Sequence, residues 1–194
     1  MSRTAKYRLS ITFNAPVVLL FVLLCFLATL AGELTDGYAT EKFFMAYHSS
    51  LLDPLTYLRL FTHVLGHSGW SHFVGNASYL LLLGPMLEEK YGGRNLAITI
   101  AVTALVIGLV HYIFFWNVAI CGASGVVFAF ILLASFTSFR DGEIPITFLL
   151  VAAIYLGQQI YNGLFTSDNI SQLAHILGGI VGAVVGFACN RRGK

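Results

Sequence analysis

The feature that most constrains this chain is the length of its runs without a charged residue. From Asn95 to Phe139 the sequence contains no Asp, Glu, Lys or Arg. This run is about twice the ~20 residues that one helix needs to cross a bilayer, so the chain must turn back within it. The apolar pattern is interrupted between Trp116 and Gly122, where we place the turn. Two antiparallel membrane helices are therefore predicted, at about 96–116 and 121–139.

Four other charge-free runs complete the pattern. They predict helices at about 13–32, 70–87, 144–163 and 170–189. Only 10% of the 194 residues are charged and 57% are hydrophobic, whereas soluble domains carry about 25% charged residues. The predicted fold class is an all-α membrane protein, a bundle of six transmembrane helices in a single domain spanning 1–194. The first helix lacks a small-residue cleavage site, so we expect it to be retained.

The basic residues set the expected orientation of the bundle. Six crossings put both termini on one side, and nine of the 11 basic residues fall on that side. They are Arg3, Lys6, Arg8, Lys90, Arg94, Arg140, Arg191, Arg192 and Lys194. Cytoplasmic loops carry such an excess, so both termini are predicted to be cytoplasmic and the aromatic-rich loop 33–69 external. A net charge of +2 does not suggest nucleic-acid binding.

Three of the predicted helices carry polar residues near their external ends. His72 and Asn76 share a face of helix 70–87, Ser124 opens helix 121–139, and His175 lies near the start of helix 170–189. Taken singly, each has a plain structural reading. The histidines and the asparagine could bond to neighbouring helices, and the small residues around Ser124 could serve only close packing.

The predicted topology changes the weight of these residues, because all three helices enter the membrane from outside. Their polar groups therefore fall in one shallow layer of the outer leaflet. A hydroxyl, an imidazole and two further hydrogen-bond donors in one layer can act as a nucleophile, a base and an anion stabiliser. The spacing of His175, Gly178 and Gly182 places them on one helix face, where a neighbouring helix can approach closely.

A metal site is the alternative that the upstream histidines raise. His63 and His67 have i, i+4 spacing, and His72 follows. The glutamate of the zinc-protease motif H-E-x-x-H is missing, so the motif is incomplete. His111 is interpreted as structural, and the three scattered cysteines, Cys25, Cys121 and Cys189, as packing residues.

These residues, in this order, resemble the rhomboid family of intramembrane serine proteases, over about residues 59–186. Gly122-Ala123-Ser124-Gly125 resembles the catalytic G-x-S-G of the family, and Ala174-His175 with Gly178 and Gly182 resembles its last conserved helix motif. Arg59, His67, His72, Asn76 and Glu88 match further positions. The chain departs from the family at Leu58, where tryptophan is typical, and at Phe128, where tyrosine is common.

The resemblance implies a Ser124–His175 catalytic dyad, with His72 and Asn76 stabilising the oxyanion and no metal or organic cofactor. Structural support is expected from Arg59, Glu88, Gly122, Gly125, Phe128, Gly178 and Gly182. The expected substrates are transmembrane proteins in the lipid bilayer, cleaved where a span is weakly helical near the outer face. The compact form suggests a multi-pass protein of a prokaryotic cell membrane. Helix 144–163, with Gly157 and Gly163, is a candidate gate, and Asp168 is not assigned as a third catalytic member.

Three other functions remain open on sequence grounds. The same groove in a non-catalytic membrane protein could bind or escort transmembrane helices. A small channel or transporter is disfavoured because no polar residues continue the path inward. A metalloprotease is disfavoured by the missing glutamate.

Overall fold

The computed structural model describes residues 12–136 and 172–192, with further helical positions at 146, 147, 149–151, 153, 154 and 157. Its named helices are α1 (Pro16–Leu34), α2 (Tyr38–Phe43), α3 (Pro54–Thr62), α4 (Trp70–Tyr91), α5 (Gly93–Phe114), α6 (Ser124–Ser135) and α8 (Gln172–Arg192). Within the described residues the only β pairing is one isolated bridge, between Ala46 and Ile120. The all-α fold class is therefore confirmed.

Most predicted membrane helices correspond to observed ones within a few residues. The helix predicted at 121–139 begins later, at Ser124, because Gly122 has a φ of +134° that a helix cannot contain. The helix predicted at 144–163 falls on isolated described positions only. Gly163, Asp168, and the basic residues Arg3, Lys6, Arg8, Arg140 and Lys194 lie outside the described residues.

The segment predicted as external loop 33–69 contains two short helices that the sequence analysis did not predict. Helix α3 begins where Asp53 accepts a hydrogen bond from the Leu55 N–H at 2.9 Å and Pro54 occupies the first helical position. An aspartate followed by proline is a common helix start. Helices α2 and α3 were therefore not predicted, although the Asp53-Pro54 pair marks the start of α3 in the sequence.

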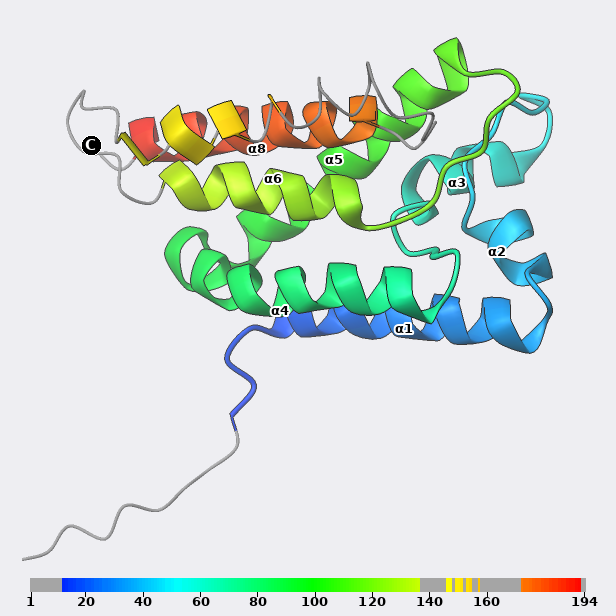
Figure 1. The fold of residues 1–194 in the computed structure, drawn as a ribbon, viewed down its shortest axis with the longest axis horizontal. Helices are drawn as coiled ribbons and strands as arrows, with labels where there is room; N and C mark the ends of the chain where they lie inside the picture. Colours follow the sequence, from blue (N-terminus) through cyan, green and yellow to red (C-terminus); the bar gives the residue numbers. More distant parts are fainter. Residues whose placement is uncertain are drawn as a thin grey trace, which may run out of the picture.

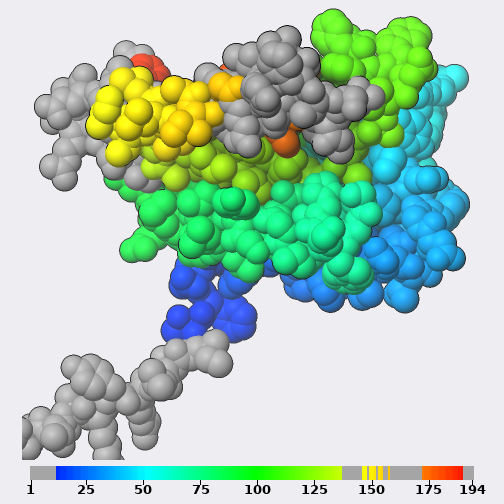
Figure 2. Space-filling model, viewed as in Figure 1, coloured from blue at the N-terminus to red at the C-terminus, as the bar shows by residue number. Residues whose placement is uncertain are grey.

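Helices α4, α6 and α8 run side by side and begin at the same end of the bundle (Figure 1). Helix α1 packs on α4 and runs in the opposite sense, and α5 crosses behind α6 and α8 in this view and contacts α4, α6 and α8. The segment containing α2 and α3 covers the end where α4, α6 and α8 begin, as the blue and cyan atoms in Figure 2 show. The described parts of the chain thus place three helix starts beneath one folded cap.

The surface of the long helices is suited to lipid. Three of the described helices are long and apolar enough to cross a membrane: Pro16–Leu34, Gly93–Phe114 and Gln172–Cys189. Large apolar side chains on them point outward, among them Leu20, Leu23, Leu27, Ile98, Val102, Leu109, Ile180 and Val184. Polar side chains such as Thr99 and Thr103 are fully buried instead. This distribution supports a membrane-embedded bundle.

Helices α6 and α8 make the closest contact in the bundle because glycines line it. A Cβ atom on Gly178 would collide with the carbonyl oxygen of Gly125, and one on Gly182 with the carbonyl oxygen of Ala129. The backbones therefore meet without intervening side chains, as in small-residue packing of membrane helices. The predicted close approach along this helix face is present in the structure.

Glu88 joins the far end of α4 to the start of α1. Its two carboxylate oxygens accept hydrogen bonds from the backbone N–H groups of Val17 and Val18, each at 3.0 Å. These N–H groups belong to the first turn of α1 and have no partner within that helix. A buried carboxylate there also stabilises the positive end of the helix dipole. Glu88 therefore acts as the N-terminal cap of another helix.

The α6–α8 contact predicts that Gly182→Ala destabilises the protein. The added methyl group would force the α6 and α8 backbones apart, and overpacking of this kind costs about 1–3 kcal/mol. We expect a lower thermal unfolding midpoint in detergent micelles. The matched control is Gly75→Ala on α4, where a Cβ meets open space and the helix gains propensity. Equal midpoints for the two variants would contradict the role of Gly182.

Candidate active site

The serine and histidine singled out by the sequence lie within hydrogen-bond distance of each other. Ser124 is the first residue of α6 and His175 is in the first turn of α8. The Ser124 Oγ is 3.0 Å from the His175 Nε2. The Phe128 ring packs on the imidazole with its centroid 4.4 Å away. A hydroxyl facing an imidazole nitrogen in this way can lose its proton to that nitrogen as it attacks a carbonyl carbon.

His72 and Asn76 lie next to Gly122. Gly122 is two residues before Ser124 in the chain. A Cβ atom on Gly122 would lie 2.8 Å from Cε1 and 2.9 Å from Nε2 of His72, and 3.9 Å from Nδ2 of Asn76. Only glycine fits this space, and its φ of +134° also excludes most other residues. The absent side chain leaves the His72 and Asn76 nitrogens facing the backbone that leads to Ser124.

The amide nitrogen of Asn76 has an unusual environment. It is buried and has no hydrogen-bond partner among the described residues. An unpaired buried donor costs free energy, of the order of 1–3 kcal/mol. A donor held unpaired beside a nucleophile is the arrangement that binds a developing oxyanion.

Four other histidines are tied to main-chain carbonyls instead. A ring nitrogen lies 3.0 Å from the carbonyl oxygen of Ala104 for His63, 3.0 Å from that of Leu65 for His67, and 2.8 Å from that of Val118 for His111. His48 is bonded in the same way, to the carbonyl of Tyr112 at 3.1 Å. Since a carbonyl only accepts, each ring donates its proton there. These histidines hold loops and helices together.

The geometry gives no support to the metal alternative. Among the described residues, no group of three His, Cys, Asp or Glu side chains is arranged to hold a metal ion. His63 and His67 each use one nitrogen on a carbonyl, and the rings of His67 and His72 are 5.0 Å apart, edge to face.

Arg59 organises the cap that contains α2 and α3. Its guanidinium is buried, bonds to Ser49 at 2.9 Å and to the Asp53 carboxylate at 3.1 Å, and lies over the Tyr47 ring. It also donates to the Lys42 carbonyl at 3.3 Å. A single buried side chain thus joins α3 to several points of the segment that precedes it.

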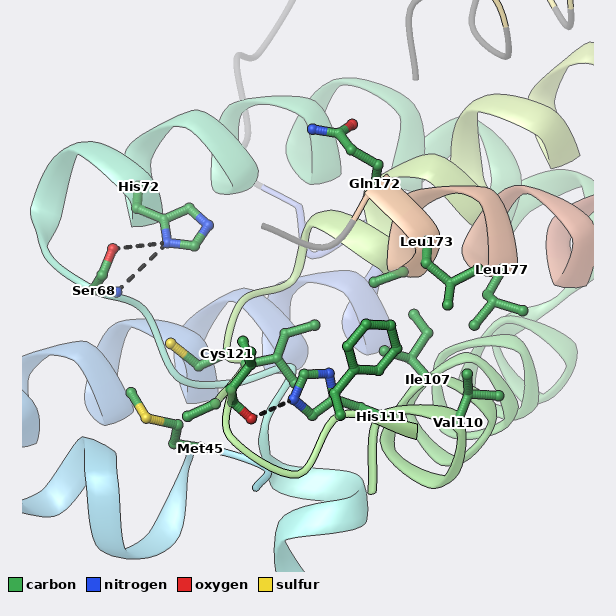
Figure 3. A pocket seen from close by; sticks show the side chains of 15 residues that line it. Met45, Ser68, His72, Ile107, Val110, His111, Cys121, Gln172, Leu173 and Leu177 are labelled. Atoms are coloured by element: carbon green, nitrogen blue, oxygen red, sulfur yellow. Dashed lines mark hydrogen bonds between the residues drawn. The ribbon is translucent and has the colours of Figure 1, made fainter. Parts of the chain in front are cut away.

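A cavity of ≈ 510 Å³ is lined by residues close to the pair in sequence, among them Cys121 and Ala174 (Figure 3). His72 lines it from α4, Leu173 and Leu177 from α8, and His111 from α5. Most of the lining is apolar. Burial raises the pKa of the Cys121 thiol to about 11, so this thiol stays protonated and is no competing nucleophile.

Two features of the site were missed by the sequence analysis. Ala46 and Ile120 exchange two backbone hydrogen bonds of 2.9 Å, which fasten the cap to the loop before Ser124. Ser68 contacts the His72 ring through its hydroxyl, at 3.2 Å. The bridge has no sequence signal, because it joins two irregular segments. Ser68 and His72 are four residues apart in the sequence. Because Ser68 lies before the start of α4, helical spacing does not predict their contact.

Comparison with known proteins identifies the family of this chain. A sequence model of the Rhomboid domain matches residues 54–192. The chain belongs to the rhomboid family. This family includes intramembrane serine proteases, and membership confirms the resemblance drawn from the motifs.

Two relatives illustrate the range of the family. Rhomboid-related protein 2 of Mus musculus is 28% identical over 191 residues, which cover 87% of this chain and 63% of the mouse protein. Rhomboid protease GlpG of Haemophilus influenzae is 25% identical over 178 residues, which cover 88% of this chain and 89% of that protein. The chain therefore spans less than two thirds of the mouse relative and most of the bacterial one.

Because the side chain of His63 is buried, we expect the rhomboid fold to lose stability in acid. Burial lowers the pKa of His63 from 6.5 to about 4. The unfolded chain takes up this proton below pH 6.5, whereas the folded protein does so only near pH 4. The free energy of unfolding should therefore fall by about 1.4 kcal/mol per pH unit between these values. The pKa of His67, lowered to about 4 mainly by burial, adds a contribution of the same sign.

Thermal unfolding of the detergent-solubilised protein at pH 7 and pH 5 checks this prediction. His63→Gln keeps an N–H donor for the Ala104 carbonyl but removes the titrating group. We expect its midpoint to fall less between the two pH values than that of the wild type. Parallel pH dependence in both proteins would exclude His63 as a cause.

Proposed function

We propose that this rhomboid protein is an intramembrane serine endopeptidase that hydrolyses peptide bonds in or near transmembrane segments. The observation that carries the proposal is the 3.0 Å contact between the Ser124 Oγ and the His175 Nε2 at the start of two adjoining helices. A hydroxyl and an imidazole in contact are also found as structural pairs. Here the unpaired Asn76 amide, and a cavity lined by the neighbouring residues Cys121 and Ala174, favour a reactive pair.

The reaction would proceed by nucleophilic catalysis. His175 accepts the Ser124 proton as the oxygen attacks the substrate carbonyl, and the same nitrogen then delivers the proton to the leaving amine. Water attacks the resulting acyl-enzyme with His175 again as base, which releases the second product. Packing of Phe128 on the imidazole would hold the ring in register with the serine.

The oxyanion would be bound by three donors: the His72 Nε2, the Asn76 Nδ2 and the Ser124 backbone N–H. The Ser124 N–H lies in the first turn of α6, where backbone donors have no helical partner. Gly122 provides the space between these groups. No metal or organic cofactor enters this chemistry.

The remaining site residues would stabilise the structure around the dyad. Gly125, Gly178 and Gly182 keep α6 and α8 in contact, Glu88 caps α1, and Arg59 holds the external cap. Alanine variants of Glu88 and Arg59 should therefore affect stability more than the chemical step.

We further propose six membrane crossings in a single domain, with both termini cytoplasmic and the site open to the extracytoplasmic side of a prokaryotic cell membrane. The beginnings of α4, α6 and α8 at one end of the bundle support this arrangement (Figure 1). The positive-inside bias supports the orientation. A site near the outer surface would also be accessible to water, the second reactant.

The substrates would be transmembrane proteins whose spans unwind easily near the outer face. A peptide bond inside a helix is hydrogen-bonded and shielded, so small residues or helix breakers near the cut would favour cleavage. The apolar cavity lined by Cys121, Leu173 and Leu177 could receive a side chain of the unwound segment. Entry past the segment that contains Gly157 remains our candidate route.

Replacement of either member of the dyad tests the proposal. Purified protein in liposomes is incubated with a single-span model substrate carrying small residues near its outer end. Ser124→Ala and His175→Ala should each lower the cleavage rate by roughly 10⁴-fold or more, because neither group works without the other. Ser135→Ala, at the opposite end of α6, serves as the matched serine control. Cleavage that survives Ser124→Ala would refute the dyad, and binding without cleavage by the wild type would favour a protein that escorts membrane helices.

The oxyanion donors give an independent prediction. His72→Ala and Asn76→Ala should each lower kcat by about 10²–10³-fold, the usual cost of one oxyanion-hole donor. KM should change much less, since the donors act on charge that forms in the transition state. A rise in KM with kcat unchanged would instead assign these residues to substrate binding.

A further inference from the structure

Ser68 contacts the one edge of the His72 ring that does not face the reaction site. Its hydroxyl lies 3.2 Å from the His72 Nδ1, and its backbone N–H points at the same nitrogen from 3.5 Å (Figure 3). The opposite nitrogen, Nε2, lies beside Gly122. The ring is therefore held between the loop before α4 and the loop before α6.

The Ser68 contact determines which His72 nitrogen carries the proton. A backbone N–H can only donate, so the Nδ1 that it faces must present a lone pair. The neutral ring then carries its proton on Nε2, toward Gly122 and the Asn76 amide. This is the reverse of His67, whose Nδ1 faces the Leu65 carbonyl and must itself be protonated. The same side chain is thus set in different tautomers by different backbone partners.

We infer that Ser68 is a positioning residue for the proposed reaction: it holds His72 as the Nε2–H tautomer, with that N–H directed at the developing oxyanion. The inference rests on the proposed function for its catalytic consequence. In the other tautomer, Nε2 would present a lone pair to the oxyanion and repel it. Ser68 acts through the imidazole, and the groups that react are Ser124 and His175.

The expected effect is smaller than that of removing a donor. Ser68→Ala loses the hydroxyl but keeps the backbone N–H, so part of the tautomer preference remains. We expect kcat to fall by about two- to tenfold, below the 10²–10³-fold cost of a missing oxyanion donor. Ser68→Thr keeps a hydroxyl and should restore most of the rate. Ser71→Ala, at the neighbouring exposed serine, should leave the rate unchanged.

A double-mutant cycle separates positioning from a general structural role. If Ser68 acts through the imidazole, Ser68→Ala should have no further effect on kcat in the His72→Ala background. An equal fold-loss in both backgrounds would overturn the inference. So would an unchanged kcat for Ser68→Ala in a wild-type protein whose cleavage depends on Ser124, an outcome that leaves the proposed function intact.

A spectroscopic measurement tests the tautomer without any use of activity. Nitrogen-15 spectra of histidine-labelled protein in micelles distinguish protonated from unprotonated ring nitrogens, and the His72→Ala variant assigns the signals. We expect His72 to be protonated at Nε2 in the wild type, with Nδ1 protonation appearing in Ser68→Ala. A wild-type ring protonated at Nδ1 would overturn the inference even if the protein proved to have no protease activity.

Discussion

Direct contact between the backbones of α6 and α8 is the constraint on which the rest of the structure depends. The hydroxyl of Ser124 and the imidazole of His175 lie on different helices and meet at 3.0 Å where these helices are in close contact. Gly178 and Gly182 allow that contact by seating α8 on the carbonyl groups of Gly125 and Ala129. In a membrane no hydrophobic force draws helices together, so close packing of small residues must supply the contact. The same glycines therefore serve both the fold and the site.

A second layer of organisation lies in the loops at the end of the bundle where α4, α6 and α8 begin. Loop backbone needs hydrogen-bond partners when it is buried, and histidine side chains provide several of them here. His63 also receives, on its own carbonyl, the N–H of Gly122 at 2.9 Å, while its ring bonds to α5. The loop that precedes Ser124 is thereby fixed to α5 and to the cap that contains α2 and α3. This loop holds Gly122 and Ser124 in place, and under the proposed function it would help to preorganise the site for electrostatic stabilisation.

Prediction from sequence succeeded where one physical rule controlled the result. Charge-free runs located the long helices, because a charged side chain is costly in the bilayer core. Helix spacing placed His175, Gly178 and Gly182 on one face. The cap helices α2 and α3 were missed, since their residues are partly apolar without long periodicity, although Asp53-Pro54 marks a helix start. The partner of Glu88 was also beyond prediction, because Val17 and Val18 offer only backbone groups that carry no mark in the sequence.

The sequence by itself determined that this protein lies in a membrane, where most of its long helices are and which residue types are available for catalysis. Hydropathy and helical periodicity are local properties, so the sequence alone shows them. Only the tertiary structure shows what the ring nitrogens of each of the six histidines contact. His48, His63, His67 and His111 are bonded to carbonyl groups from distant or neighbouring segments, whereas His72 and His175 face Gly122 and Ser124. A histidine's role depends on what its two nitrogens meet, and that is settled by contacts between segments far apart in the chain.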